Sequence, residues 1–237
     1  MIDAYEQTGK LIRQVKRRVA SSYRNYDRRP RRNNRILHDY KCIFIHIPKT
    51  GGSSIASVLN NLPNRTYPPI CIPELYKHAK AVEVQRALGA EMWNEYFTFA
   101  IVRNPWDLMV SSYNWWLQKA YKWPALHPQI DKIKAMGSFE AFMQSKYGRF
   151  MINEFEGDDM FDWISNRNAI IVDYVGRFEA LDDAWLEICT RLNVTGTPLT
   201  HLNQSERKHY RDYYSDKTKD IVYRRFRKTI DWFGYEY

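Results

Sequence analysis

The feature that most constrains the fold of this chain is residues 41–55, KCIFIHIPKTGGSSI, in which an apolar run leads directly into a double-glycine turn. Residues 41–47 are rich in β-branched and aromatic side chains, which is typical of a buried strand. Residues 53–62, after the glycines, have the pattern of a helix. A strand, a tight turn and a helix in immediate succession indicate an α/β fold, in which helices cover the faces of a sheet.

Strands and helices alternate along most of the remaining chain. Two further buried strands are predicted at 96–104 and 169–179. A helix follows each of these strands, at 105–120 and 181–194. Two more predicted helices complete the pattern: 80–93 and 215–235. The sequence therefore predicts one α/β domain with a P-loop-like three-layer fold, in which helices flank a mainly parallel central sheet.

The excess positive charge of the chain lies almost entirely at its start. The 237 residues carry a formal net charge of +9, but residues 1–41 hold 12 of the 36 Lys and Arg and only 4 of the 27 Asp and Glu. The remaining 24 basic and 23 acidic residues give the rest of the chain a net charge of only +1. A nucleic-acid platform on the main body is therefore disfavoured. We divide the chain into a basic N-terminal extension, 1–40, and a domain, 41–237.

The extension is expected to be a mobile basic arm or an additional helix packed on the domain. In its second half, the charge density and Pro30 are typical of a solvated linker. The alternative is that the arm docks on an anionic polymer or a membrane surface. Contact with an anionic surface is thus assigned to the arm and not to the domain.

Cysteine usage and the N-terminal sequence bear on the compartment. Cys42, Cys71 and Cys189 are scattered and odd in number, and their spacing fits no metal site, even together with the histidines. A reducing compartment without a structural disulfide is the expected setting. The N-terminus contains no long apolar run, so neither a signal peptide nor a membrane anchor is predicted. We therefore expect a soluble, cytoplasmic protein.

The loop after the first strand collects groups that bind anions. Its glycines, Gly51 and Gly52, let backbone N–H groups approach a ligand, and the following helix adds the positive end of its dipole. Lys49 adds a full charge, and three neighbours add hydroxyl donors: Thr50, Ser53 and Ser54. The lysine precedes the glycines, so the pattern differs from G-x-x-x-x-G-K-[ST], and no apolar strand ending in aspartate completes a magnesium–nucleotide site. A P-loop nucleotide kinase or hydrolase is therefore the less favoured interpretation.

The second strand ends in a similar way. Arg103 stands at its carboxyl end, and Ser111 and Ser112 lie about two turns into the next helix. A guanidinium with a nearby hydroxyl suits a second phosphate, although Arg103 paired with a carboxylate is the alternative. Because open α/β sheets place ligands at the carboxyl ends of their strands, the two loops together predict a ligand with anionic groups at both ends.

These two loops resemble motifs of the sulfotransferase superfamily, whose sulfuryl donor is 3′-phosphoadenosine 5′-phosphosulfate (PAPS). HIPKTGG is similar to the family's 5′-phosphosulfate loop, and RNPWDLMVSSY is similar to its 3′-phosphate motif, with arginine and serine eight positions apart. Three further stretches are also similar: KHAKA, VGRFEALDD and HLNQSERKHYRDYY. The resemblance covers about residues 41–237 and is closest to carbohydrate sulfotransferases, including bacterial relatives that lack a membrane anchor. It implies that this region is a sulfotransferase-like catalytic domain.

The resemblance also implies a division of the donor between the loops. The 5′ end of PAPS would be held by the first loop: Lys49, Thr50, Gly51, Gly52, Ser53 and Ser54. The 3′-phosphate would be held by Arg103 and Ser111. A C-terminal loop folding over the nucleotide would add three residues: Arg207, Lys208 and Tyr210. One departure from the family pattern is Leu108, where many relatives have another arginine, and this change leaves Arg103 more isolated.

The resemblance further implies sulfuryl transfer by in-line attack of a hydroxyl acceptor, a carbohydrate or glycosylated molecule, without a metal. Lys49 beside the bridging oxygen would stabilise charge on the leaving phosphate. A histidine is the natural proton acceptor near neutral pH, and His78 matches the base that follows the first loop in related enzymes. His46 and Glu74 are the alternative bases. The competing functional classes are the nucleotide kinase or hydrolase, and a non-catalytic anion-binding module that uses its basic arm.

Overall fold

The computed structural model describes most of the chain from residue 36 onward. The described residues are 36–64, 66, 72, 75, 78–118, 120–122, 124–149, 159–194, 198–199 and 207–237. Most of the predicted N-terminal extension therefore lies outside the described residues, as do the alternative base Glu74 and Cys71.

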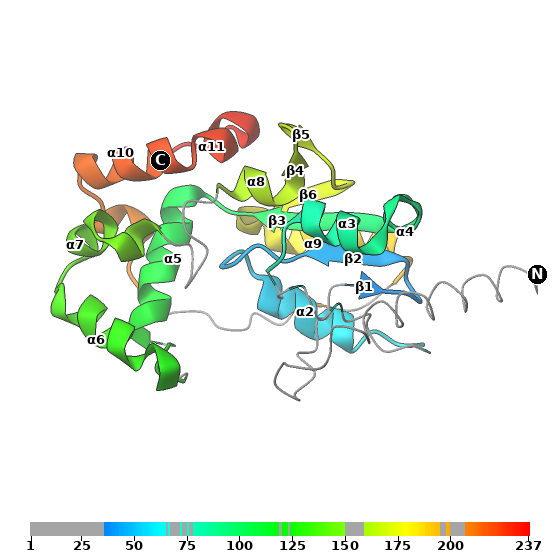
Figure 1. Ribbon diagram of the computed structural model, residues 1–237, viewed down its shortest axis with the longest axis horizontal. Coiled ribbons are helices and arrows are strands. Elements are labelled where there is room, and N and C mark those ends of the chain that lie inside the picture. The colour runs from blue at the N-terminus through cyan, green and yellow to red at the C-terminus, as the bar shows by residue number, and fades with distance from the viewer. Residues whose placement is uncertain are drawn as a thin grey trace, which may run out of the picture.

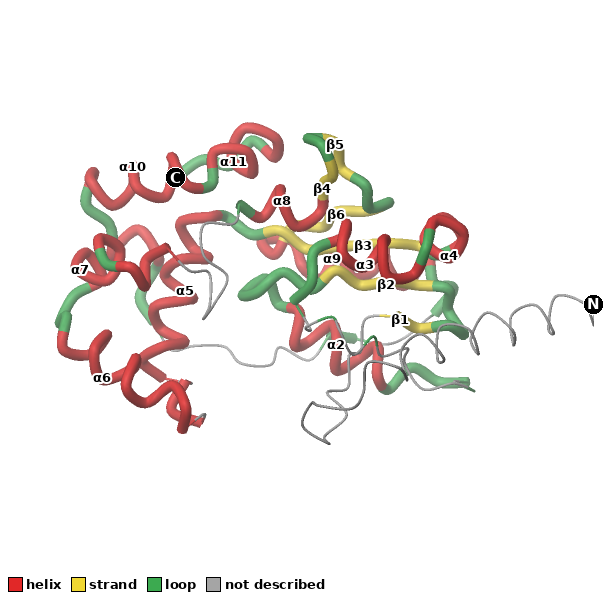
Figure 2. The backbone as a smooth tube through the Cα atoms, in the orientation of Figure 1, coloured by secondary structure: helices red, strands yellow, loops and turns green. Residues whose placement is uncertain are grey.

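A four-stranded sheet forms the centre of the fold, as Figures 1 and 2 show. Its strands, in spatial order, are β1 (Ile36–Leu37), β2 (Cys42–Ile45), β3 (Phe97–Val102) and β6 (Tyr174–Arg177). The last three run parallel, whereas β1 pairs antiparallel with β2 at the edge. Ile45 lies opposite Ala100 and Val102 lies opposite Arg177, so the carboxyl ends of the three parallel strands lie at the same end of the sheet. The predicted α/β class with a mainly parallel sheet is confirmed.

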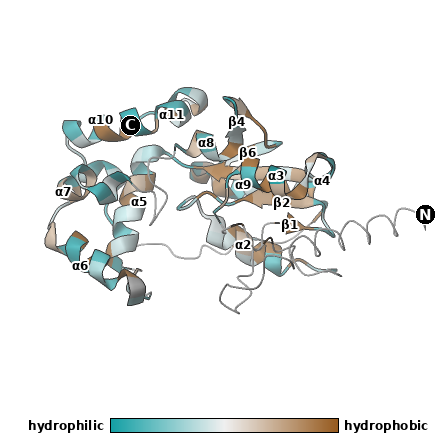
Figure 3. Cartoon of the chain, in the orientation of Figure 1, coloured by the Kyte–Doolittle hydropathy of each residue, from teal (hydrophilic) through white to brown (hydrophobic). Residues whose placement is uncertain are grey.

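Helices cover both faces of this sheet and produce three layers. One face carries α2 (Gly52–Asn60) and α9 (Leu181–Arg191), and the other carries α3 (Ala81–Leu88), α4 (Ala90–Glu95) and α8 (Met160–Ile164). Side chains alternate along β2, since Cys42 and Phe44 pack with α2 and α9 while Ile43 and Ile45 pack with the opposite layer. Burial of both faces explains why the strands have continuous apolar runs, visible as brown segments in Figure 3.

A second group of helices lies beyond the carboxyl ends of the parallel strands (Figure 1). Its members are α5 (Pro105–Gln118), α6 (His127–Ala135), α7 (Phe139–Gln144) and α10 (Asp216–Arg225). The other three pack against α5, which starts at the end of β3. Trp116 of α5 is buried against Tyr147, and Tyr113 contacts Phe139 and Phe142. The strand end therefore fixes the start of α5, and aromatic packing fixes the rest.

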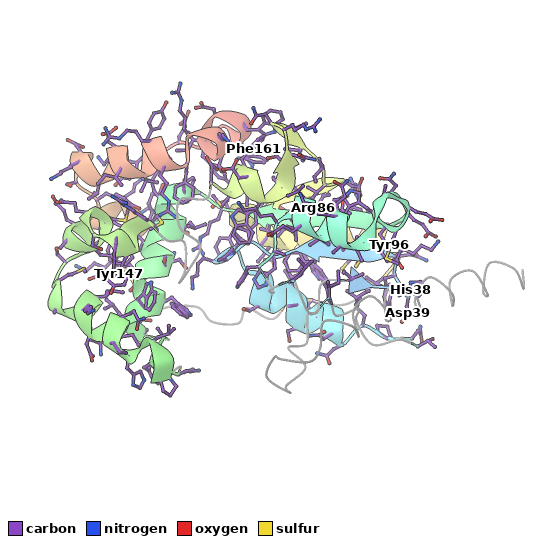
Figure 4. The ribbon with its side chains drawn as sticks, viewed as in Figure 1. His38, Asp39, Arg86, Tyr96, Tyr147 and Phe161 are labelled. Carbon is purple, nitrogen blue, oxygen red and sulfur yellow. The ribbon has the colours of Figure 1, made fainter. Side chains whose placement is uncertain are left out.

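The other end of the sheet, where the parallel strands begin, has its own polar contacts. His38 is hydrogen-bonded to Tyr96, and Lys41 pairs with Glu95 at 2.5 Å. Figure 4 shows His38, Asp39 and Tyr96 gathered at this end of the molecule, away from α5. The predicted anion-binding loops lie at the carboxyl ends of the strands.

Two helices predicted as continuous are each divided in the structure. The predicted helix 80–93 breaks at Gly89, whose φ of 86° lies in the left-handed region, and α4 follows. The predicted helix 215–235 breaks at Phe226, after which α11 (Arg227–Phe233) begins. Phe226 is fully buried, so the break allows α10 and α11 to direct side chains into one core.

The third predicted strand, 169–179, is also divided. β5 (Ala169–Ile170) pairs antiparallel with β4 (Ser165–Asn166) in a separate hairpin, and only β6 joins the central sheet. The hairpin turn consists of Arg167 and Asn168, with φ of 49° and 64°. Two consecutive residues with positive φ are typical of a two-residue hairpin turn.

Phe226→Ala should destabilise the domain because this side chain is fully buried where α10 and α11 meet. The cavity should lower the free energy of unfolding by about 3–5 kcal/mol. The matched control is Tyr223→Ala, since Tyr223 lies in α10 three residues before Phe226 and is 42% exposed, and its loss should stay below about 1 kcal/mol. Urea denaturation followed by circular dichroism measures both values. Equal losses in the two variants would contradict this assignment of the core.

Candidate active site

Three chain segments meet where the parallel strands end, and Arg103 joins them. Arg103 follows β3, and its Nη1 donates a hydrogen bond at 2.7 Å to the carbonyl oxygen of Lys49, in the loop after β2. Its guanidinium carbon lies 3.8 Å from the ring centroid of Phe178, which follows β6. Arg103 is only 6% exposed. The two loops that the sequence assigned to opposite ends of one ligand therefore lie in direct contact.

The loop after β2 has a backbone conformation suited to an anion. Lys49 and Gly51 have positive φ, 67° and 81°, whereas Thr50 between them does not. Alternating backbone handedness turns successive N–H groups toward one concave side, as in the backbone nests that bind phosphate groups. α2 begins at Gly52, so N–H groups of its first turn add the positive end of the helix dipole. The loop can thus hold an anion with its main chain.

Both glycines of this loop are required, for different reasons. Gly51 has positive φ, and a Cβ there would also come within 3.0 Å of Leu181 and 3.2 Å of Phe178. Gly52 provides space, because a Cβ at this position would lie 2.0 Å from Cδ2 of His46. The His46 ring therefore packs directly on the start of α2.

The predicted side-chain ligands of the loop differ in their surroundings. Thr50 is fully buried, and its hydroxyl donates to a main-chain carbonyl three residues earlier at 2.9 Å, which stabilises the turn. Ser54 is also buried, whereas Ser53 is exposed. The ammonium of Lys49 lies 5.8 Å from the ring centroid of Trp115 in α5. The lysine charge is therefore placed between the loop and α5.

Asp107, a carboxylate to which the sequence assigned no role, connects two of the predicted arginines. Its Oδ2 accepts hydrogen bonds from Nε and Nη2 of Arg103 at 2.8 and 2.6 Å. Its Oδ1 accepts a hydrogen bond from Nη2 of Arg207 at 2.5 Å. The carboxylate pairing considered as the alternative for Arg103 is thus present, and the same carboxylate brings the C-terminal segment into the site. Leu108, where the resemblance implies an arginine in many relatives, is fully buried.

Burial and charge act in opposite directions within this cluster of Arg103, Asp107 and Arg207. Burial lowers the pKa of Arg103, and the charge of Asp107 opposes that shift. Burial acts to raise the pKa of the Asp107 carboxyl, but Arg103 and Arg207 outweigh it and hold the pKa below its usual value. Two guanidinium groups, which stay protonated in proteins, face one carboxylate, so the cluster carries one net positive charge. Nη1 of Arg207 is buried and has no hydrogen-bond partner among the described residues.

The predicted 3′-phosphate ligand Ser111 differs in its surroundings from Lys208 and Tyr210, which were predicted to belong to a loop folding over the nucleotide. Ser111 is largely buried one turn beyond Asp107, on the same face of α5. Lys208 is exposed, and Tyr210 packs against the ring of Tyr237. Ser111 therefore shares a helix face with Asp107, whereas Lys208 faces solvent and Tyr210 is engaged in ring packing.

The end of β3, from which Arg103 extends, is fixed by a network of polar contacts. The side-chain oxygen of Asn104 accepts the N–H of Trp106 at 3.0 Å and so caps the start of α5. Glu179 accepts the N–H of Asn104 at 2.6 Å and the hydroxyl of Tyr235 at 3.1 Å. These bonds join the ends of β3 and β6 to the C-terminal segment.

His78, the predicted base, lies just before α3 and is 7% exposed. Its Nδ1 lies 2.9 Å from the main-chain carbonyl oxygen of His46, and since a carbonyl only accepts, Nδ1 carries the proton. In the neutral ring the basic lone pair is then on Nε2. The rings of His46 and His78 are 4.4 Å apart, and Trp163 contacts His78 edge-on. His46 therefore links the predicted base to the first loop.

Sequence reasoning missed three parts of this site: Asp107, Phe178 and the carbonyl of His46. A local signal existed for Asp107, because residues four apart on a helix are neighbours and Arg103 stands four positions before it. No local signal existed for the other two, since the residues that they contact are distant in the chain.

The described part of the chain shows neither a cluster of metal ligands nor a membrane-spanning helix. These residues contain no group of three or more His, Cys, Asp or Glu that could hold a metal ion. The same residues include no helix with the length and apolar character needed to cross a bilayer. Cys42 and Cys189 are free and buried, and burial raises the pKa of Cys42 to about 12.

One protein family matches nearly the whole chain. The model of the sulfotransferase family covers residues 32–236. No curated protein and no solved structure matches the chain.

Gly52→Ala should disrupt the site because the new methyl group would occupy the position of the His46 ring. Crowding of this kind should lower the free energy of unfolding by about 1–3 kcal/mol. Ser57→Ala, in the same helix, is the control and should change it by no more than about 0.5 kcal/mol. In a His46→Ala background the penalty of Gly52→Ala should largely disappear, as thermal unfolding of the four variants would show. An undiminished penalty would mean that His46 does not cause the crowding.

Proposed function

Because the chain belongs to the sulfotransferase family, we propose that it transfers a sulfuryl group from PAPS to a hydroxyl of a carbohydrate or glycosylated acceptor. The observation that carries this proposal is the 2.7 Å hydrogen bond from Arg103 to the carbonyl of Lys49. It makes one continuous site of two loops that each suit an anion, and PAPS carries anionic groups at its 3′ and 5′ positions. A donor with anionic groups at two positions is therefore the ligand that we propose for the two joined loops.

Each end of the donor has its own set of proposed ligands. The backbone of the nest-like loop and α2 would hold the 5′ end, with the side chains of Lys49, Ser53 and Ser54. Thr50 would contribute its main-chain N–H, since its hydroxyl is bonded within the loop. Arg103, Ser111 and Arg207 would hold the 3′-phosphate, and Lys208 and Tyr210 remain as proposed outer contacts. Asp107, Ser111 and Trp115 lie on one face of α5 at steps of about 6 Å, so this helix would run along the donor.

The transfer requires a proton acceptor and a stabilised leaving group. We assign the first role to His78, whose Nε2 is the basic nitrogen because Nδ1 donates to the His46 carbonyl. Nε2 would take the proton of the acceptor hydroxyl while the hydroxyl oxygen forms its bond to sulfur in line with the leaving group. The bond between sulfur and the 5′-phosphate oxygen breaks, and the Lys49 ammonium would stabilise the charge left on that oxygen. The products are a sulfate ester and 3′,5′-bisphosphoadenosine (PAP), and the proton stays on His78.

The proposal extends to the organisation and setting of the protein. Residues 41–237 would form the catalytic domain and 1–40 a basic arm, although β1 shows that residues 36–37 already pair with the sheet. The arm would be the part that contacts an anionic surface, and the nearly neutral domain would not bind nucleic acid. The free cysteines Cys42 and Cys189 support a cytoplasmic location.

PAP should stabilise the fold much more than ATP with Mg²⁺ does, because the proposed site has two contacting loops, one for each phosphate of PAP. At 100 times its Kd, PAP should add about 2.7 kcal/mol of stability and raise Tm by roughly 5–10 °C. Adenosine 5′-monophosphate (AMP) serves as the control that lacks the 3′-phosphate. Thermal-shift measurements with the three ligands test the donor assignment, and an equal or larger shift with ATP–Mg²⁺ would contradict it.

His78→Ala should lower kcat by about 10²- to 10⁴-fold while leaving the Kd for PAP nearly unchanged, because it removes a base and not a donor contact. The readout is radiolabelled sulfuryl transfer from PAPS to a mixed set of glycans, with PAP binding followed by calorimetry. His127→Ala is the matched control, since His127 is exposed on α6. Turnover near the wild-type value in His78→Ala would move the role to another group.

A further inference from the structure

Asp107 holds two positive side chains from distant segments against one carboxylate. Arg103 reaches it from the end of β3, and Arg207 reaches it from the C-terminal segment. Both carboxylate oxygens are used: Oδ2 by Arg103 and Oδ1 by Arg207. All three side chains are largely buried, with 7%, 16% and 15% exposure for Arg103, Asp107 and Arg207. The contact is therefore part of the interior of the site and not a surface ion pair.

Two guanidinium groups would repel each other in this position without the carboxylate. The charge of Arg207 acts against ionisation of Arg103, and Asp107 offsets that effect. Because like charges weaken one another strongly in a buried setting, an intervening anion is needed to keep both arginines near one point. Asp107 cancels only one of the two charges, so the cluster keeps a net positive charge for a ligand.

The arginines retain hydrogen-bond donors that Asp107 does not use. Nη1 of Arg207 is buried and has no partner among the described residues. A buried donor without a partner is costly, and such atoms call for an explanation such as an absent ligand. Ser111 lies one turn along α5 from Asp107, on the same face. The proposed function assigns these donors to the 3′-phosphate.

We propose that Asp107 is a positioning residue that holds Arg103 and Arg207 as a two-arginine clamp for the 3′-phosphate of the donor. This inference rests on the proposed function and deepens it. The second arginine of the clamp comes from the C-terminal segment, whereas the position one residue after Asp107 holds the buried Leu108. Asp107 would not touch the donor, since the arginines occupy both of its oxygens. It would nevertheless determine the preference for a 3′-phosphorylated nucleotide.

The test compares Kd values for PAP and AMP, measured by calorimetry on the full chain. Asp107→Asn removes the charge and keeps the shape. It should weaken PAP binding roughly 10- to 100-fold, the range expected for lost charge-assisted hydrogen bonds. AMP binding should change by less than about threefold, because AMP lacks the group that the clamp holds. Asp216→Asn is the matched control, since Asp216 is also a first-turn carboxylate, in α10, but is fully exposed.

Arg207→Gln provides a second test of the clamp, which does not depend on whether the Asp107→Asn variant folds. Arg207→Gln should weaken the binding of PAP more than that of AMP. Adding Asp107→Asn to Arg207→Gln should reduce the affinity for PAP by a smaller factor than Asp107→Asn does in the wild-type chain. Asp107→Glu, which keeps the charge, should retain more of the preference for PAP than Asp107→Asn does. These results together would establish that Asp107 acts through the arginines.

The outcomes separate failure of the clamp from failure of the proposed function. If Asp107→Asn or Arg207→Gln weakens PAP and AMP by the same factor, the carboxylate only supports the fold and the clamp is refuted, while the donor assignment stands. Independent, fully multiplicative effects of the two substitutions would refute it as well. A wild-type protein that does not prefer PAP to AMP would overturn both the donor assignment and the clamp.

Discussion

The site depends on the burial of one charge, the guanidinium of Arg103. A buried guanidinium must be paired and hydrogen-bonded, and Arg103 obtains its acceptors from two other parts of the chain: the Lys49 carbonyl and the Asp107 carboxylate. The ring of Phe178 covers its face from a third segment. Satisfying a single side chain therefore ties together the ends of three parallel strands, and these contacts fix the geometry of the two loops that we propose to bind the donor.

His46 plays a comparable role on the other side of the first loop. Its carbonyl fixes the tautomer of His78, and its ring fills the space that the missing side chain of Gly52 leaves. His46 thus positions both the proposed base and the proposed 5′ ligands, although we assign it no catalytic role. A displacement of His46 would change the orientation of His78 and the start of α2 together.

The two cores explain why such a polar edge is stable. Each face of the sheet is covered by helices, so apolar packing holds the strands in place. The strand ends therefore need to contribute little to the stability of the sheet. α5 is anchored in addition by aromatic contacts to its neighbours, which keeps the face carrying Asp107 and Ser111 in front of the strand ends. Charges that cost stability in isolation can therefore be concentrated where the strands end.

The sequence alone determined the α/β class and the order of its main strands and helices, and it predicted the two loops that we propose to bind the donor. It could do so because apolar runs, helical periodicity and motifs such as PKTGG and RNPWD are patterns of neighbouring residues. It missed the helix breaks at Gly89 and Phe226, where a left-handed glycine and a buried side chain outweigh helical periodicity. Only the tertiary structure decided that Arg207 meets Asp107 and that a carbonyl orients His78, because those contacts join residues far apart in the chain and depend on how the layers pack.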